Sequence, residues 1–132
     1  MLLTHRRTKQ AGTVVATLLL VVTIGACTSE TTRPLARGEL RGELISPDGD
    51  VGAAVIELRG ITDVTAIAGR VFTEQSGDVL RAVFILESPG LVEFSVRLTD
   101  VEGTPSGTVV DVADGSNTTP ASLEGYHVRF SL

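Results

Sequence analysis

The sequence predicts an all-β fold: a single small β-sandwich of about seven strands in residues 38–132, after a cleaved N-terminal signal segment. In most of the predicted strands, hydrophobic and polar residues alternate with a period of two, which is typical of half-buried strands. Turns containing Gly or Pro separate these segments at intervals of about 8–14 residues, as in sandwiches and small barrels. No segment shows the sustained i, i+3, i+4 pattern, with capping residues, that indicates a helix.

The first element is residues 1–26, which we interpret as a secretory signal peptide. Arg6, Arg7 and Lys9 form a basic start, and residues 11–26 then carry no charge and are rich in Val and Leu. A basic region, an apolar region and small residues before a cleavage site are the marks of such a peptide. A retained membrane-spanning helix is the alternative, but it needs about 20 apolar residues, more than this segment offers.

The segment ends in Ile24-Gly25-Ala26-Cys27, which resembles the lipobox of bacterial lipoproteins. The resemblance covers residues 1–27. It implies cleavage before Cys27 and a covalent diacylglycerol, with further acyl chains such as palmitate, on Cys27. Because Cys27 is the only cysteine, it has no partner for an intramolecular disulfide, and acylation accounts for an otherwise unpaired thiol in an exported chain. The resemblance also implies a lipid-anchored, extracytoplasmic place in the cell envelope, and Thr28 after the cysteine leaves an outer-membrane destination open.

Residues 27–37 are predicted to be a flexible tether, since they include Pro34 and show no hydrophobic period. Ten residues of coil span roughly 17–20 Å on average, enough to lift a domain off a membrane surface. Residues 27–132 contain 8 basic and 16 acidic residues, a formal net charge of −8. That charge argues against nucleic acid as a partner, because binding phosphates needs clusters of Lys and Arg.

The predicted strands follow the tether in order, and in them inward-facing and outward-facing residues alternate. They are expected over residues 39–44, 54–59, 63–72, 79–86, 92–98, 108–113 and 126–132. Turns are expected at 46–50, 75–78 and 88–90, where Gly occurs together with Asp, Pro or both, and loops at 102–107 and 114–125. Gly69 is a candidate β-bulge, because it interrupts the third predicted strand.

The strand over residues 79–86 is the most apolar part of the predicted domain. Leu80, Ala82, Phe84 and Leu86 are expected to face the core. The other face, Val79, Arg81, Val83 and Ile85, includes a charge that a dry core would tolerate poorly without a partner. We therefore predict that this face is at least partly exposed and docks a partner protein. The alternative is that this face belongs to a second core layer, and that Arg81 extends its charged end past the edge of that layer.

Sequence patterns for other chemistry are weak. Asp48, Asp50, Asp111 and Asp114 lie in or beside predicted turns and are candidate Ca²⁺ ligands, although their spacing does not fit the EF-hand loop and Asp-Gly is common in turns. The predicted metal content is therefore none, and no cofactor is expected besides the lipid. His127 is the only histidine after residue 27, which makes a catalytic triad improbable.

Carbohydrate binding and glycoside hydrolysis are weakly supported as well. Phe72 and Tyr126 are the only rings near the ends of predicted strands, whereas Phe84, Phe94 and Phe130 are expected in the core. Glu39 and Glu43 share a strand face with Arg41, which indicates solvated charge rather than a pair of catalytic carboxylates.

Residues 38–132 also resemble, faintly and without a diagnostic motif, cohesin-like and immunoglobulin-like sandwich domains. The resemblance begins with the entry of Gly49–Gly52 into a strand, and it concerns the fold alone. The sequence predicts a non-enzymatic binding or structural module. The alternative is a sandwich that binds Ca²⁺ or a small ligand, including carbohydrate, and a hydrolase ranks third.

Overall fold

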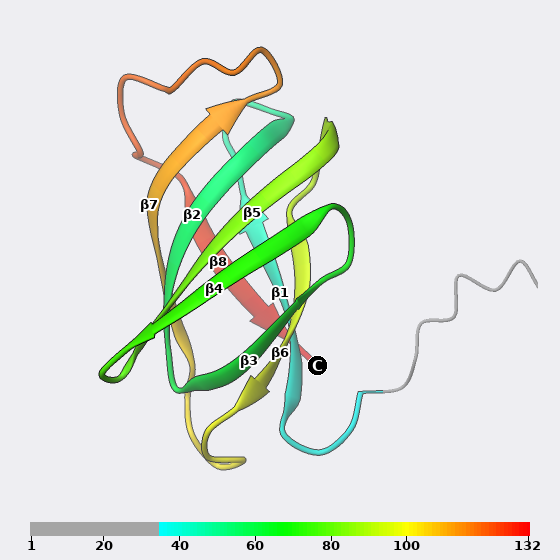
Figure 1. Ribbon diagram of the computed structural model, residues 1–132, viewed down its shortest axis with the longest axis vertical. Coiled ribbons are helices and arrows are strands. Elements are labelled where there is room, and N and C mark those ends of the chain that lie inside the picture. Colours follow the sequence, from blue (N-terminus) through cyan, green and yellow to red (C-terminus); the bar gives the residue numbers. More distant parts are fainter. Residues whose placement is uncertain (1–34) are drawn as a thin grey trace, which may run out of the picture. The chain divides into compact units, whose positions relative to one another are not determined.

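A computed structural model describes residues 35–132, and within that range the chain forms eight β-strands and no helix (Figure 1). The predicted signal peptide, Cys27 and most of the predicted tether lie outside the described residues. The strands are β1 (Glu39–Ile45), β2 (Val51–Arg59), β3 (Ile61–Ala66), β4 (Arg70–Ser76), β5 (Val79–Gly90), β6 (Glu93–Leu98), β7 (Ser106–Asp114) and β8 (His127–Ser131).

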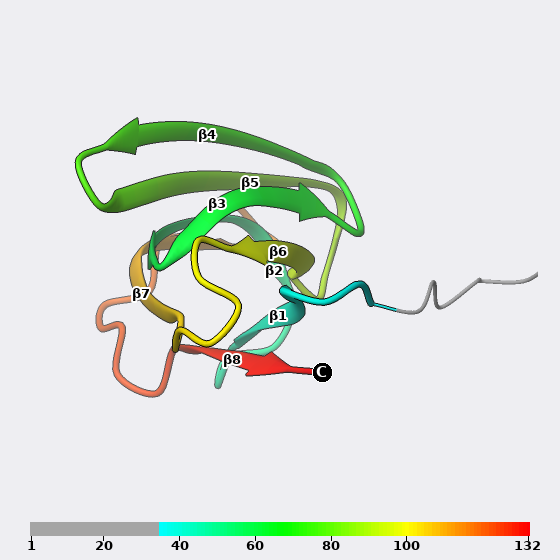
Figure 2. The ribbon, with the colours of Figure 1, turned by 90° about the horizontal axis from the view of Figure 1, so that it is seen from below.

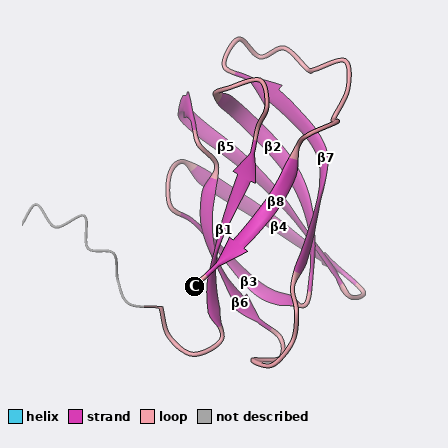
Figure 3. Ribbon diagram, turned by 180° about the vertical axis from the view of Figure 1, so that it is seen from behind, coloured by secondary structure: helices cyan, strands magenta, loops and turns pink. Residues whose placement is uncertain are grey.

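The strands form two four-stranded antiparallel sheets. Sheet A has the order β3-β6-β1-β8 and sheet B the order β4-β5-β2-β7. Figure 1 views the sandwich from the side of sheet B, and Figure 3 views it from behind, with β1 and β8 in front. The predicted all-β sandwich is therefore confirmed.

The number of strands differs from the predicted seven, because residues 63–72 do not form one strand. β3 ends at Ala66 in sheet A, and β4 begins at Arg70 in sheet B, so the chain crosses between the sheets here. Gly69 belongs to this crossover and is not a bulge. Its φ of +74° lies in the left-handed region, and a Cβ would collide with the backbone carbonyl oxygen of Ile85, so glycine is required.

Two other boundaries were also predicted wrongly. The expected turn at 88–90 lies within β5, which continues to Gly90 and pairs there with Val51. Pro89 is tolerated because the β2–β5 register shifts between Val51 and Ala53, and irregular ladders accommodate a residue without an N–H. The expected loop over 102–107 is shorter, because β7 begins at Ser106.

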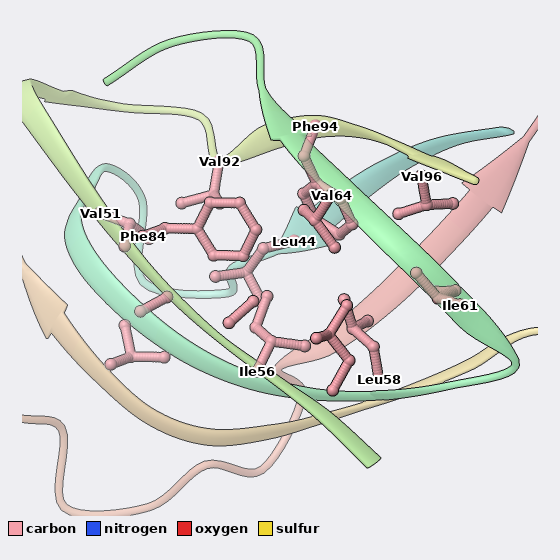
Figure 4. Packing of buried hydrophobic residues seen from close by; sticks show 14 of the residues in the cluster. Leu44, Val51, Ile56, Leu58, Ile61, Val64, Phe84, Val92, Phe94 and Val96 are labelled. Carbon is pink, nitrogen blue, oxygen red and sulfur yellow. The ribbon is translucent and has the colours of Figure 1, made fainter. Parts of the chain in front are cut away.

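The core lies between the inner faces of the sheets, where alternate residues of both sheets meet (Figure 4). Phe84 of sheet B packs against Phe94 of sheet A, with ring centroids 4.8 Å apart, and the Phe130 ring meets Phe94 edge-on at 6.4 Å. Gly42 makes room for the Phe94 ring, since a Cβ at that position would overlap it. The three phenylalanines predicted for the core are thus packed there, with Phe130 at its margin.

Candidate functional site

The outer face of sheet A is polar, and opposite charges on neighbouring strands pair across it. Glu39 lies opposite Arg97, with 3.7 Å between Oε1 and Nη2, and Glu43 lies opposite Arg129, with 2.6 Å between Oε2 and Nη2. Arg41 lies between the two glutamates on β1, on the same face. Glu39 and Glu43 thus lie on a charged outer face, but their side chains are only 11% and 28% exposed.

The outer face of sheet B is different, because apolar side chains from all four strands meet on it. The strand register places Phe72, Val83 and Val55 side by side in one row, and Ile85, Ala53 and Ala113 in the next. We call these six residues the outer apolar cluster. Phe72 is 56% exposed and Ile85 47% exposed, while the other four are half-buried. Large exposed apolar side chains that lie together mark candidate interaction sites.

β5 accounts for the centre of the cluster, because both of its faces are largely apolar. Leu80, Ala82 and Phe84 point into the core and are buried. The residues between them point outward, as expected: Arg81 and Ile85 are exposed, and Val79 and Val83 are half-buried. Their proposed role in binding a partner stays a prediction.

The cluster is bordered by charge on three sides. At the β4 edge its second row ends in Arg70, and at the β7 edge its first row ends in Asp111. The next row across the sheet alternates in sign, since Arg81 of β5 lies between Glu74 of β4 and Glu57 of β2. Arg81 is exposed within this row, which agrees both with a docking face and with an arginine that extends past the edge of a second core layer, so Val83→Asp is needed to separate the two predictions. An apolar centre with a charged rim is the usual anatomy of a protein interface.

A shallow, open hollow lies on the β7 side of the cluster. It is lined by Ala53, Val55, Val83, Ala113 and the side of the loop at Thr119, with Asp111 at its margin. Two of its lining residues, Ala53 and Ala113, lie opposite each other and have small side chains, which leaves room there. Its lining combines small apolar side chains with one carboxylate, that of Asp111. This combination suits a positively charged side chain of a partner.

Of the four candidate Ca²⁺ ligands, Asp48 and Asp50 lie between β1 and β2, whereas Asp111 and Asp114 belong to β7. Three of them accept hydrogen bonds within the chain. Asp48 Oδ2 accepts a 2.9 Å hydrogen bond from the Tyr126 hydroxyl. Asp114 Oδ1 accepts from the backbone N–H groups of Ser116 and Thr118, at 2.8 and 2.9 Å, and so shapes its own turn. Asp111 Oδ1 accepts from the N–H of Val112, at 2.9 Å.

Asp50 is exposed in the turn that precedes β2. Among residues 35–132, no group of three or more His, Cys, Asp or Glu side chains lies close enough to hold a metal ion. Ca²⁺ binding stays a hypothesis, and its test is a melting experiment.

The remaining candidates for chemistry have structural surroundings. Tyr126 is buried, and burial raises the pKa of its phenol, with a further contribution from Asp48. A buried ring cannot serve as a platform for a sugar, which leaves Phe72 as the exposed member of that predicted pair. His127 lies exposed at the start of β8, an edge strand of sheet A, and its Nδ1 is 3.1 Å from the carbonyl oxygen of Gly125.

Sequence reasoning found the β5 part of the outer apolar cluster but missed what the neighbouring strands add. Phe72 was considered only as a platform for a sugar, because residues 63–72 were taken as one strand. Treating Gly69 as a turn would have placed Phe72 in a strand of its own. Ala53, Val55 and Ala113 join the cluster only through the strand register, which no local pattern reveals.

The lipobox cysteine Cys27 lies outside the described residues. Across residues 35–132 the structure holds no helix that is long and apolar enough to cross a membrane. Because β-sandwiches host many unrelated functions, the fold does not indicate which one this chain has. No protein-family model, curated protein or solved structure matches the chain.

Proposed function

We propose that this chain is a lipid-anchored, non-enzymatic module of the cell envelope that binds a partner protein through the outer apolar cluster. The observation that carries the proposal is the contrast between the two outer faces. Sheet A covers its outer face with paired charges, whereas sheet B exposes Phe72 and Ile85 beside four half-buried apolar residues. Exposing that surface to water costs free energy, about 25 cal/mol per Å² of apolar area, which a partner would recover by covering it.

The shape of the cluster favours a protein over a sugar or a small apolar ligand. Five of its six members are Ala, Val or Ile on a four-stranded sheet, so they form a broad surface and not a deep pocket. Phe72 is its one ring, and stacking surfaces for sugars generally need more. The hollow beside the cluster is open, whereas small ligands are usually held in deep pockets.

The border of the cluster also limits the chemistry of the partner. Asp111 lies at the β7 end of the row that contains Val55 and Val83, beside the shallow hollow. A partner that places apolar side chains over Val83 and Ile85, and a Lys or Arg toward Asp111, would match both features. Charge matching of this kind sets orientation and association rate more than affinity.

Attachment to a membrane is supported by the lipobox resemblance of residues 24–27 and by the lone cysteine. Each buried methylene of an acyl chain contributes about 0.8 kcal/mol of membrane affinity, so two or three chains anchor stably. Residues 27–37 would then connect the anchor to the sandwich.

The anchor is tested by metabolic labelling with a tagged fatty acid in bacteria that produce the full chain. The wild type should carry the label, and Cys27→Ser should carry none and accumulate as a longer precursor. Equal labelling of both proteins would show that Cys27 is not the lipid attachment site.

The binding face is tested by substituting the centre of the cluster in the anchored full chain. A photo-cross-linking amino acid at Ile85 should capture a defined partner, identified by mass spectrometry, and Val83→Asp should abolish that capture. Ser95→Asp is the matched control, because Ser95 occupies the middle of a strand on the outer face of sheet A.

Both variants should melt near the wild-type temperature, since Val83 is only half-buried. Unfolding of Val83→Asp would mean that Val83 belongs to the core and that the face is not a docking surface. Capture that persists in a folded Val83→Asp would place the partner elsewhere.

A further inference from the structure

β4 is an edge strand without a proline, a bulge or a short length, three of the features by which edge strands usually avoid pairing with other chains, and its two charged residues, Arg70 and Glu74, are opposite in sign. It pairs with β5 on one side, and it is the last strand of sheet B on the other. Figure 2 shows it at the outermost margin of the sandwich. All of its seven residues except Val71 are exposed. It contains no proline, and its register with β5 is continuous, so no bulge turns it away.

The other edge strands of the described sandwich are protected. β7, the opposite edge of sheet B, has a register irregularity between Val55 and Ile56 of its partner β2. β8 has only five residues, and it carries His127 and Arg129. β3 shows a register shift where it pairs with β6 and places Asp63 on the outer face. Bulges, short length and charge are the usual means of blunting an edge.

The sequence of β4 is complementary to itself in one antiparallel register. If Phe72 of one copy lies opposite Phe72 of a second copy, Arg70 lies opposite Glu74 of that copy, and Glu74 opposite its Arg70. All of these side chains lie on the outer face, since they alternate with Val71 and Thr73. On the inner face, the same register sets Val71 opposite Thr73, a pair of β-branched residues that suits a ladder.

Neighbouring registers lack this match. Moving the second copy by two residues in one direction sets Phe72 opposite Glu74. Moving it by two further residues sets Glu74 opposite Glu74. Moving it by two residues in the opposite direction sets Arg70 opposite Phe72. Two further residues in that direction set Arg70 opposite Arg70. Like charges directly opposite each other destabilise an antiparallel pair. Only the register centred on Phe72 pairs both charges.

We infer that β4 is a homodimerisation edge: two copies of this chain pair their β4 strands antiparallel about Phe72 and join their B sheets into one eight-stranded sheet. The charge row of each copy then continues into the other, in the order Glu57, Arg81, Glu74 and the second copy's Arg70. The two Phe72 rings cover each other, so the most exposed aromatic side chain of the described residues leaves water. Pairing of this type takes its affinity from main-chain hydrogen bonds and its specificity from side chains.

This dimer does not depend on the proposed partner, and the two are tested by different residues. Pairing at β4 requires Arg70, Phe72 and Glu74, whereas partner capture requires Val83. Because the strand edges and not the sheet faces meet, the dimer covers only Phe72 of each outer apolar cluster. Val83, Ile85 and the three cluster residues of β2 and β7 stay open in both copies.

The register can be tested by disulfide cross-linking in membranes from cells that produce the full chain. Directly opposite Cα atoms of antiparallel strands are about 4.5–5.5 Å apart, within the range of about 4.4–6.8 Å that a disulfide spans. Phe72→Cys should therefore yield a covalent dimer under mild oxidation. Arg70→Cys or Glu74→Cys alone should yield little, and the two variants produced together should yield the mixed dimer.

The wild type, which has only Cys27, controls for cross-links through that residue. Asp63→Cys is the matched control, because Asp63 is exposed on the edge strand β3 of sheet A. Equal cross-linking at Asp63→Cys and Phe72→Cys would indicate random collision, and no cross-linking at Phe72→Cys would equally overturn the inference.

Charge exchange at positions 70 and 74 gives a second test, in which the Phe72→Cys cross-link serves as the readout. In chains that also carry Phe72→Cys, Arg70→Glu or Glu74→Arg should lower the yield of covalent dimer several-fold, since each reversal sets like charges opposite each other twice. The double variant Arg70→Glu, Glu74→Arg should restore the yield. A double variant no better than the single ones would overturn the register, and unchanged yields in all of them would overturn the pairing of charges.

Discussion

The residue Tyr126 links two turns of the sandwich. Its ring is buried, and its hydroxyl donates a 2.9 Å hydrogen bond to Asp48, in the turn between β1 and β2, 78 residues earlier in the chain. Tyr126 itself follows the long loop that precedes β8. The bond therefore fixes the end of that loop against the turn that leads into sheet B. A part-buried hydrogen bond to an ionised acceptor is expected to contribute measurably to stability.

Tyr126→Phe should lower the free energy of unfolding at neutral pH by about 1–2 kcal/mol, because the hydrogen bond is lost while the exposed carboxylate of Asp48 remains hydrated. Burial, and then Asp48, raise the pKa of the phenol above the ordinary value of 10.0. An unfolded chain then ionises at lower pH than the folded chain, so the tyrosine contribution is complete below pH 10 and declines above it.

Urea unfolding of the full chain at neutral pH and at several pH values above 10 measures both effects. The wild type should lose stability above pH 10 more steeply than Tyr126→Phe, and the two should converge there. Parallel pH profiles would show that Tyr126 is not responsible for the alkaline loss.

At the scale of elements, the strands that alternate most regularly could be predicted, and those that depend on pairing could not. β1, β2 and β6 follow the periodicity of their own residues, and Phe94 and Leu58 are buried where the pattern places them. The segment of β3 and β4 misled prediction because Val64, Ala66 and Ala68 continue one apolar face past the end of β3 at Ala66. Gly69 is consistent with either a bulge or a turn, and only the crossover between sheets decides which.

The candidate site was predicted only in part, for a related reason. The two apolar faces of β5 can be predicted from residues 79–86, since no other predicted strand is largely apolar on both faces. The partners of that outer face come from three other strands, and their register depends on hydrogen bonding between distant segments. The edge position of β4, on which the dimer depends, is likewise a property of strand order.

At the scale of the whole described sandwich, a single apolar core joins the two sheets. Fifteen hydrophobic residues are buried in it, and no charged or polar residue is buried among residues 35–132. Charged groups lie instead on the outer faces and in the turns, as the ion pair of Arg59 with Asp78 illustrates. A core of this composition favours folding by apolar burial alone, without a metal or a disulfide.

Removal of divalent metals should therefore leave the melting temperature of the full chain unchanged. A Ca²⁺ site occupied at 100 times its dissociation constant would add about 2.7 kcal/mol to the free energy of unfolding. For a domain of this size, each kcal/mol corresponds to about 4–8 °C, so a chelator would lower the melting temperature well beyond experimental error. Circular dichroism melts with EDTA, with excess Ca²⁺ and with excess Mg²⁺ make the measurement.

The matched variants are Asp48→Asn and Asp114→Asn, because asparagine keeps an acceptor oxygen for the hydrogen bonds from Tyr126 and from Ser116 but removes the charge that Ca²⁺ needs. We expect their melting temperatures to be as insensitive to Ca²⁺ as that of the wild type. A wild-type melting temperature that falls with EDTA, recovers with Ca²⁺ but not with Mg²⁺, and loses this response in either variant would instead identify the turns around Tyr126 as a calcium site. In that case both aspartates would coordinate the ion in addition to shaping their turns.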